Sequence, residues 1–278
     1  MTRRKSWMLC AALALAGTPA AACPDPALAC QVKGGAYHIA LPEGTTGPVP
    51  ALIWLHGLGG SGASSIRAAT VAQPFLDRGW AVIAPNGSPM TTRPSGYRWN
   101  FSGRGDDPRD EAAFLDAVRA DAVARFGIDG ARVVLGGFSN GAFMATYVAC
   151  DTPEAFAAYV PVAGTFWRPH PESCQGPVRL LQTHGWRDTT VPLEGRPLRG
   201  GRALQGNVFE ALGIWRAANG CPRPDASFSA REGSFLLRRW SGCAPGTALE
   251  FALFDGGHTV PEGWADLVLD WIETRGGS

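Results

Sequence analysis

Short apolar runs alternate with longer amphipathic stretches along most of the chain, and this alternation predicts strands and helices in turn. Strands are expected over residues 37–41, 50–55, 80–84, 133–135, 156–163, 179–183, 235–240 and 249–254. Helices are expected over residues 64–78, 110–126, 140–149, 207–219 and 264–274. The first run alternates apolar and polar residues, which favours an edge strand. The order indicates an α/β fold with a mostly parallel central sheet and helices on both faces.

The chain is long enough for one large α/β domain, and it contains no repeat, low-complexity tract or linker that would mark a second one. We therefore expect a single domain without a large cap. A long irregular loop is expected over residues 88–109. Long loops inside compact domains are usually functional.

The first 22 residues have the features of a secretory signal peptide. Arg3, Arg4 and Lys5 give a positive start, residues 7–16 are apolar, and residues 20–22 are small, as at a cleavage site. The apolar part is too short to span a bilayer comfortably. A mature domain over residues 23–278, secreted or periplasmic, is therefore predicted. Lipidation of Cys23 is the alternative, but a lipidation signal would favour leucine where Ala20 stands.

An even number of cysteines remains once the signal is removed, and in an exported chain this predicts disulfides. Six cysteines allow 15 pairings. Proximity along the chain favours Cys23–Cys30, Cys150–Cys174 and Cys221–Cys243. No cysteine or histidine spacing resembles a zinc site, so we expect no metal and no cofactor.

The charge distribution argues against nucleic acid as a partner. The formal net charge is +1, and no basic run follows the first five residues. We also expect a monomer that acts on a small or polymer-linked substrate.

Candidate chemistry begins at residues 137–141, GFSNG, which lie between a predicted strand and a predicted helix. The pattern G-x-S-x-G in this context forms a sharp turn that lifts the serine above the sheet edge, and its glycines leave room for the turn to close. On its own the pattern could be a glycine-rich loop. Its position between a strand and a helix favours Ser139 as a nucleophile.

An acid and a base are expected at the carboxyl ends of later strands, because ligands bind at that edge of a parallel sheet. Asp188 follows the strand over 179–183, and His258 follows the last strand. The order serine, acid, histidine is the one expected after such a serine turn. Asp255 is a rival acid, but it lies on the same strand end as His258. His56 and His184 each precede a glycine at a strand end, where a structural histidine is the simpler interpretation.

Two backbone N–H groups should stabilise the anionic intermediate. One belongs to Asn140, after the nucleophile, and the other to the loop over 56–60, where spacing favours Leu58 over Gly57. Four tryptophans are candidates for an apolar substrate cleft: Trp99, Trp167, Trp186 and Trp264.

The chain resembles the secreted polyhydroxybutyrate depolymerase and feruloyl esterase group of α/β-hydrolases. The matching motifs are PALIWLHGLGGSG, the WN pair of the long loop, GFSNGAFMA, YVPVAG, HGWRDTTVPLEG and GGHTVPEGW, which run from about Val49 to Trp264. The resemblance implies a triad of Ser139, Asp188 and His258 and an oxyanion loop at His56-Gly57-Leu58. Val260 and Trp186 depart from the group's usual residues, which implies a reshaped pocket.

The predicted function is that of a secreted serine esterase that works through an acyl-enzyme. Hydroxyalkanoate oligomers and feruloyl or acetyl esters of plant polysaccharide are the expected substrates. The alternatives are a peptidase or an acyltransferase on the same triad. A binding protein without activity is less consistent with the sequence, because all three triad residues are present.

Overall fold

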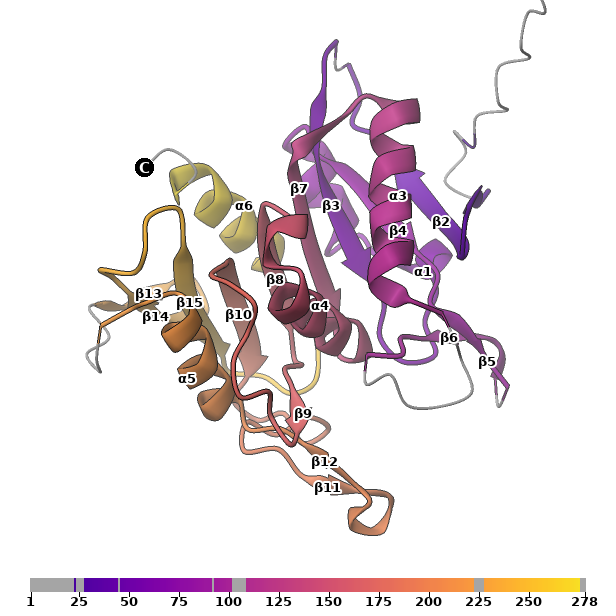
Figure 1. Cartoon of the computed structure of the whole chain (residues 1–278). Coiled ribbons are helices and arrows are strands. Elements are labelled where there is room, and N and C mark those ends of the chain that lie inside the picture. Colours follow the sequence, from indigo (N-terminus) through magenta and orange to yellow (C-terminus); the bar gives the residue numbers. More distant parts are fainter. Residues whose placement is uncertain are drawn as a thin grey trace, which may run out of the picture.

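Six parallel strands form the centre of one twisted sheet (Figure 1). The computed structural model describes residues 23, 28–44, 46–91, 93–101, 109–222 and 228–275. The predicted signal peptide over 1–22 lies outside this range. Most residues of these strands are buried, as expected for strands covered on both faces. In spatial order they are β4 (Ala81–Pro85), β3 (Val49–Leu55), β7 (Ile128–Phe138), β8 (Ala158–Val162), β10 (Arg179–Gly185) and β15 (Ala248–Phe254).

Antiparallel strands complete the sheet at both ends. On one side, β2 (Gly35–Ala40) pairs with β4, and β1 (Cys30–Val32) pairs with β2. On the other, β14 (Phe235–Trp240) pairs with β15, and β13 (Phe228–Glu232) pairs with β14. The expectation that the strand near residue 37 lies at the edge was wrong, because β1 covers it. The predicted α/β fold itself is confirmed.

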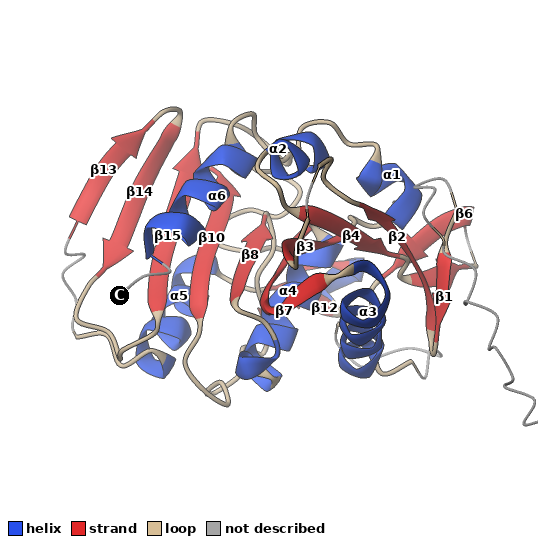
Figure 2. Ribbon diagram, turned by 90° about the horizontal axis from the view of Figure 1, so that it is seen from above, coloured by secondary structure: helices blue, strands red, loops and turns tan. Residues whose placement is uncertain are grey.

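Helices cover both faces of the sheet (Figure 2). One face carries α3 (Glu111–Phe126), α4 (Asn140–Asp151) and α5 (Val208–Ala218) over the larger apolar core. The opposite face carries α1 (Gly62–Ile66), α2 (Ala72–Asp77) and α6 (Trp264–Arg275). The ends of α3 follow directly from the sequence. Asp110 accepts a hydrogen bond from the Ala113 N–H at 3.0 Å, and Gly127 ends the helix with φ 66°.

The single helix expected over 64–78 is in fact two short ones, α1 and α2. Pro74 has no N–H, and in a continuous helix its ring would clash with the carbonyl of Thr70. The break places Pro74 in the first turn of α2, where proline is tolerated.

Shorter elements extend beyond the carboxyl ends of the parallel strands. The long loop contains a hairpin of β5 (Ser88–Met90) and β6 (Arg93–Arg98), and its residues 102–108 lie outside the described range. A second hairpin projects from the domain in Figure 1. It consists of β11 (Pro197–Leu198), the short helix η2 (Arg199–Gly201) and β12 (Ala203–Gln205), and β12 pairs with β9 (Trp167–Arg168). One further short helix, η1 (Pro153–Ala155), follows α4.

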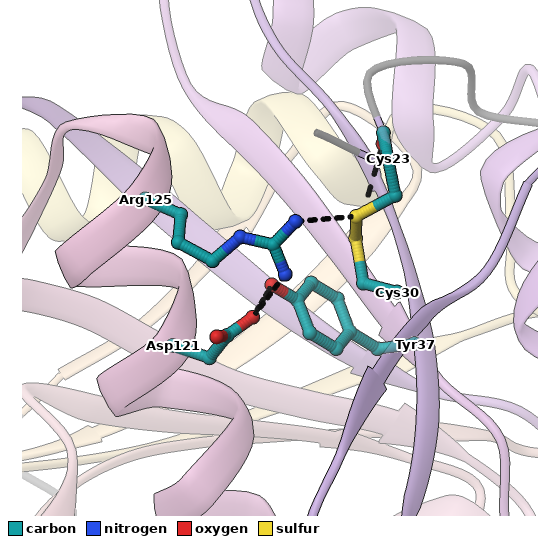
Figure 3. The surroundings of a disulfide bond; sticks show 5 residues. All are labelled: Cys23, Cys30, Tyr37, Asp121 and Arg125. Atoms are coloured by element: carbon teal, nitrogen blue, oxygen red, sulfur yellow. Dashed lines mark hydrogen bonds and ion pairs between the residues drawn. A yellow bond between two sulfur atoms is a disulfide. The ribbon is translucent and has the colours of Figure 1, made fainter. Parts of the chain in front are cut away.

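Disulfides join the cysteines in the pairs expected from their proximity: Cys23–Cys30, Cys150–Cys174 and Cys221–Cys243. The first pair holds the N-terminal segment against α3, where Arg125 contacts Cys23 and forms an ion pair with Asp121 (Figure 3). Tyr37 donates a hydrogen bond to the same carboxylate at 2.5 Å. Because its sulfur is in a disulfide, Cys23 is not free to carry the lipid that was the alternative.

Within the described ranges, no helix has both the length and the apolar character that a membrane span requires. Over the same residues, histidine, cysteine and carboxylate side chains do not gather into a group that could hold a metal ion.

Candidate active site

Ser139 lies at the sharp turn between β7 and α4, with φ 54° and ψ −113°. A positive φ is strained for a serine, and it is held here by close packing. A Cβ on Gly137 would lie 2.6 Å from the Gly141 backbone, and one on Gly141 would lie 2.2 Å from the Leu55 carbonyl oxygen. The Ser139 N–H also donates to the Val162 carbonyl at 2.9 Å. The two glycines of the motif are therefore required for the turn to close.

Three side chains predicted from the sequence meet at this edge of the sheet. The Ser139 hydroxyl lies 2.9 Å from His258 Nε2, and His258 Nδ1 lies 2.7 Å from Asp188 Oδ2. Asp188 follows β10, and His258 follows β15. The Phe138 ring packs against the imidazole, with 4.7 Å between the ring centroids, and so fixes its plane. This arrangement can move a proton from the serine to the histidine while the carboxylate holds the ring.

The Asp188 carboxylate is fixed on both of its oxygens. While Oδ2 faces His258, Oδ1 accepts hydrogen bonds from the N–H groups of Thr190 and Val191, each at 2.8 Å. The residue is only 5% exposed. Burial raises the pKa of the Asp188 carboxyl, but the hydrogen bonds from His258 and Val191 outweigh this effect, so the pKa lies below its ordinary value. The group is therefore ionised at neutral pH.

His184 supports the loop that carries Asp188. Its Nε2 lies 2.7 Å from the Val191 carbonyl oxygen, to which it donates. Burial lowers the pKa of His184, so the ring is neutral and its 3.6 Å approach to Asp188 is not a charged pair. The residue has the structural role expected from the sequence.

His56 supports the loop after β3 in the same way. Its Nδ1 lies 2.8 Å from the Gly57 carbonyl oxygen, and its Nε2 accepts from the Gly87 N–H at 3.0 Å. Burial lowers the pKa of His56 to about 4, so it is neutral at physiological pH. The rival acid Asp255 has a side chain that is 81% exposed, and it pairs with Arg187 at 3.1 Å.

Leu58 and Asn140 line the same cleft as Ser139, and their backbone N–H groups are the predicted oxyanion donors. Neither has a hydrogen-bond partner among the described residues. The Leu58 loop is held from outside, because Gly59 donates to the Tyr97 carbonyl at 2.8 Å and Tyr97 donates to the Gly60 carbonyl at 3.0 Å. Two free donors beside the serine are suited to a developing oxyanion.

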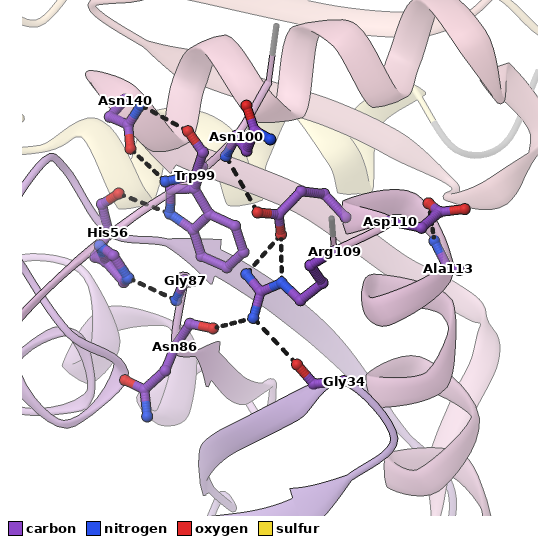
Figure 4. A network of polar contacts seen from close by, with 11 residues as sticks. Gly34, His56, Asn86, Gly87, Trp99, Asn100, Arg109, Asp110, Ala113 and Asn140 are labelled. Carbon is purple, nitrogen blue, oxygen red and sulfur yellow. Dashed lines mark hydrogen bonds and ion pairs between the residues drawn. The ribbon is translucent and has the colours of Figure 1, made fainter. Parts of the chain in front are cut away.

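Asn140 also acts through its side chain, for which no role was expected from the sequence. Its Oδ1 accepts from the Trp99 N–H at 2.6 Å, and its Nδ2 donates to the Trp99 carbonyl at 3.2 Å (Figure 4). The Trp99 indole in turn donates to the His56 carbonyl at 3.0 Å. The start of α4 therefore holds the segment that supports the Leu58 loop. The only sequence signal for this contact was the WN pair in the long loop.

Replacing Asn140 with alanine should lower the free energy of unfolding by about 1–3 kcal/mol, because the buried Trp99 N–H would lose its partner. Asn140→Asp keeps the acceptor, so its loss of stability should be smaller. Its carboxylate would lie beside the oxyanion position, so its kcat should still fall. Urea unfolding and ester turnover measure the two effects. An unchanged unfolding free energy for Asn140→Ala would show that the side chain does not hold this segment.

A cleft of about 1190 Å³ opens from Ser139 toward β9 and the β11–β12 hairpin. One wall is aromatic and combines the long loop, α4 and β9. Phe101 lies at its centre, with ring centroids 5.1 Å from Phe143, 5.8 Å from Tyr147 and 5.5 Å from Trp167. The volume exceeds that of a typical small-molecule pocket, about 300–1,000 Å³.

The four candidate tryptophans have different environments. Trp167 lines the cleft, and Trp99 borders it with only 2% of its surface exposed. Trp264 does neither, and its assignment to substrate binding was wrong: it is 0% exposed and packs 4.8 Å from Trp54 in the core beneath α6. Trp186 is 64% exposed and lies outside the cleft lining. Phe143 and Tyr147 were missed, although they follow Ser139 at intervals of four residues on one helix face.

A family model described as phospholipase/carboxylesterase matches residues 39–198. Among curated proteins, feruloyl esterase C of Emericella nidulans is 25% identical over 233 residues, which cover 82% of this chain and 77% of that protein.

Solved structures share the fold. An acetyl xylan esterase from Aspergillus awamori superposes with a TM-score of 0.64 at 18% identity and covers 86% of this chain and 93% of its own. A Bacillus cereus carboxylesterase gives 0.55 at 16% identity, covering 86% of this chain and 93% of its own.

Proposed function

Since this chain belongs to the phospholipase/carboxylesterase family of α/β-hydrolases, we propose that it is a secreted serine esterase that cleaves aromatic acyl esters, such as feruloyl esters of plant polysaccharide. The hydrogen-bonded series from Ser139 through His258 to Asp188, open to a large cleft, carries the proposal. The three disulfides support export to an oxidising compartment.

The reaction proceeds through an acyl-enzyme. Ser139 Oγ attacks the ester carbonyl carbon as its proton passes to His258 Nε2. The oxyanion is stabilised by the N–H groups of Leu58 and Asn140. Collapse of the intermediate breaks the bond to the alcohol oxygen, which takes the proton from His258. Water then attacks the acyl-enzyme with His258 as base, which releases the acid and restores the serine.

The acyl preference follows from the aromatic wall. A flat cinnamoyl-type ring can stack against Phe101, Phe143 and Trp167, and each aromatic pair adds about 0.5–1.5 kcal/mol beyond area burial. An acetyl or hydroxybutyryl group gains less from such a surface. The similarity to a feruloyl esterase supports the same choice.

Hydrolysis of an ester panel tests the proposal. Methyl ferulate, p-nitrophenyl acetate, p-nitrophenyl octanoate and a hydroxybutyrate trimer should all be compared by kcat/KM, and methyl ferulate is expected to rank first. If the protein cleaves the hydroxybutyrate trimer well and leaves methyl ferulate intact, the proposed preference for aromatic acyl groups is contradicted. Failure to cleave any ester, with cleavage of peptides instead, would favour the peptidase alternative.

A further inference from the structure

The lining of the cleft is rich in arginine. The lining contains five arginines and one carboxylate, an excess of four positive charges in a chain whose net charge is +1. The charged residues of the lining are Arg98, Arg168, Arg196, Arg199, Arg202 and Asp151. Cleavage of a neutral ester has no need for this charge.

Three of these arginines lie on the β11–β12 hairpin, which is attached to the catalytic edge. The Gln205 side chain donates to the Thr190 carbonyl at 3.1 Å, and Arg196 Nε donates to the same oxygen at 3.0 Å. The Thr190 N–H also donates a hydrogen bond to Asp188 Oδ1, so Thr190 contacts both the hairpin and Asp188. Gln205 pairs with Trp167 across the strands, which joins the hairpin to the aromatic wall.

The tip of the hairpin holds Arg199 in an unusual backbone conformation. Arg199 has φ 52°, and it is followed by Gly200 and Gly201 with φ 63° and 87°. A positive φ is uncommon for a residue with a long side chain, and such strain clusters at ligand-binding sites. The turn therefore displays an arginine where a third glycine or an asparagine would fit with less strain.

On the β11–β12 hairpin, Arg199 and Arg202 are the two arginines whose guanidinium groups have neither a hydrogen-bond partner nor an ion-pair partner among the described residues. Arg168 pairs with Glu210 at 3.3 Å, and Arg196 is engaged at its Nε. Over the described residues, neither Arg199 nor Arg202 forms an ion pair, and both are exposed on the cleft. Their guanidinium groups are suited to hold a carboxylate in a bidentate manner.

We propose that Arg199 and Arg202 form a carboxylate subsite, so that the enzyme prefers esters that carry an anionic group away from the scissile bond. The inference rests on the proposed esterase function and names its substrate class. The carboxylate can belong to a sugar acid or to the free end of a hydroxy acid oligomer. Both place an anion several bonds from the ester.

Matched esters that differ only in a terminal carboxylate test the subsite. On the acyl side, p-nitrophenyl hexanoate is compared with the mono-p-nitrophenyl ester of adipic acid. On the alcohol side, hexyl ferulate is compared with 5-carboxypentyl ferulate. For each pair, kcat/KM of the anionic ester is divided by kcat/KM of the neutral ester. This ratio is measured in low salt and in about 0.5 M NaCl, which screens exposed charges.

In at least one pair the wild-type ratio should exceed that of Arg199→Gln/Arg202→Gln by about fivefold, as expected for two exposed charge pairs. Salt should remove the difference. Arg67→Gln is the matched control, because Arg67 is an exposed arginine outside the cleft lining. It should behave as wild type. If the ratio of kcat/KM is the same in wild type and double variant for both pairs of esters, the subsite is overturned.

The neutral esters keep the two proposals apart. Their turnover reports the esterase function and should be similar in wild type and double variant. If no ester is cleaved, the proposed function fails, and binding of trigalacturonate to the Ser139→Ala protein decides on the subsite. If the Ser139→Ala protein binds trigalacturonate more tightly than a neutral galactose trisaccharide, and the double variant loses this difference, the subsite is supported. Equal binding would overturn it. A preference for trigalacturonate would also show that the carboxylate of a sugar acid fits the subsite.

Discussion

Replacing Ser139 with alanine is expected to lower kcat for ester hydrolysis by about 10⁴- to 10⁶-fold, as in other enzymes that lose a triad nucleophile. The Ser139 hydroxyl lies 2.9 Å from His258 Nε2. Without it no acyl-enzyme forms, while the Leu58 and Asn140 donors remain. The measurement is turnover of methyl ferulate by wild type and variant, with folding checked by urea unfolding.

Ser139→Gly is the matched variant for this experiment. Both substitutions remove the nucleophile, but only glycine adopts φ 54° and ψ −113° without strain. Strain of this kind costs about 1–3 kcal/mol, so the glycine variant should unfold at higher urea concentration than the alanine variant. Activity retained above a trace in either protein would mean that another residue attacks the ester.

The framework of the site could be predicted because it depends on local rules. The turn at Ser139 requires glycine on both sides, and those glycines are visible in the sequence. Parallel strands end at one sheet edge, so residues just after β10 and β15 had to approach the serine. The proximity of Ser139, Asp188 and His258 follows from these two facts. The substitutions Ser139→Ala and Asp188→Asn test their proposed roles in catalysis.

The walls of the cleft depend on tertiary contacts that no local pattern encodes. Trp264 begins an amphipathic helix whose apolar face turned out to pack on the sheet, so it became part of the core. Trp186 follows a strand end, yet its side chain points to solvent. Residues 196–205 contain glycine, proline and arginine and predict only a loop. Their pairing with β9 is what brings Arg199 to the cleft.

The second large effect is expected for Asp188→Asn, which should lower kcat by about 10⁴-fold, as in a serine protease triad. The structure explains how the amide would be oriented. The Thr190 and Val191 N–H groups both donate to Oδ1, so the amide oxygen must take that position and the NH₂ group must face His258 Nδ1. The imidazole would then carry its proton on Nε2, toward Ser139, and could no longer accept the serine proton.

Asp255→Asn separates this effect from a general loss of negative charge near His258. Asp255 is exposed and pairs only with Arg187 among the described residues, so its substitution should leave kcat within about twofold of wild type, in keeping with the small worth of exposed ion pairs. Comparison of Asp188→Asn with Asp255→Asn decides between the two acids, because both substitutions are isosteric and they differ only in position. A large loss in Asp255→Asn with little change in Asp188→Asn would transfer the role of the acid to Asp255. Because Asp188 is ionised well below neutral pH, the contrast between the variants should hold across pH 6–8, which is about two to four units above the ordinary carboxyl pKa.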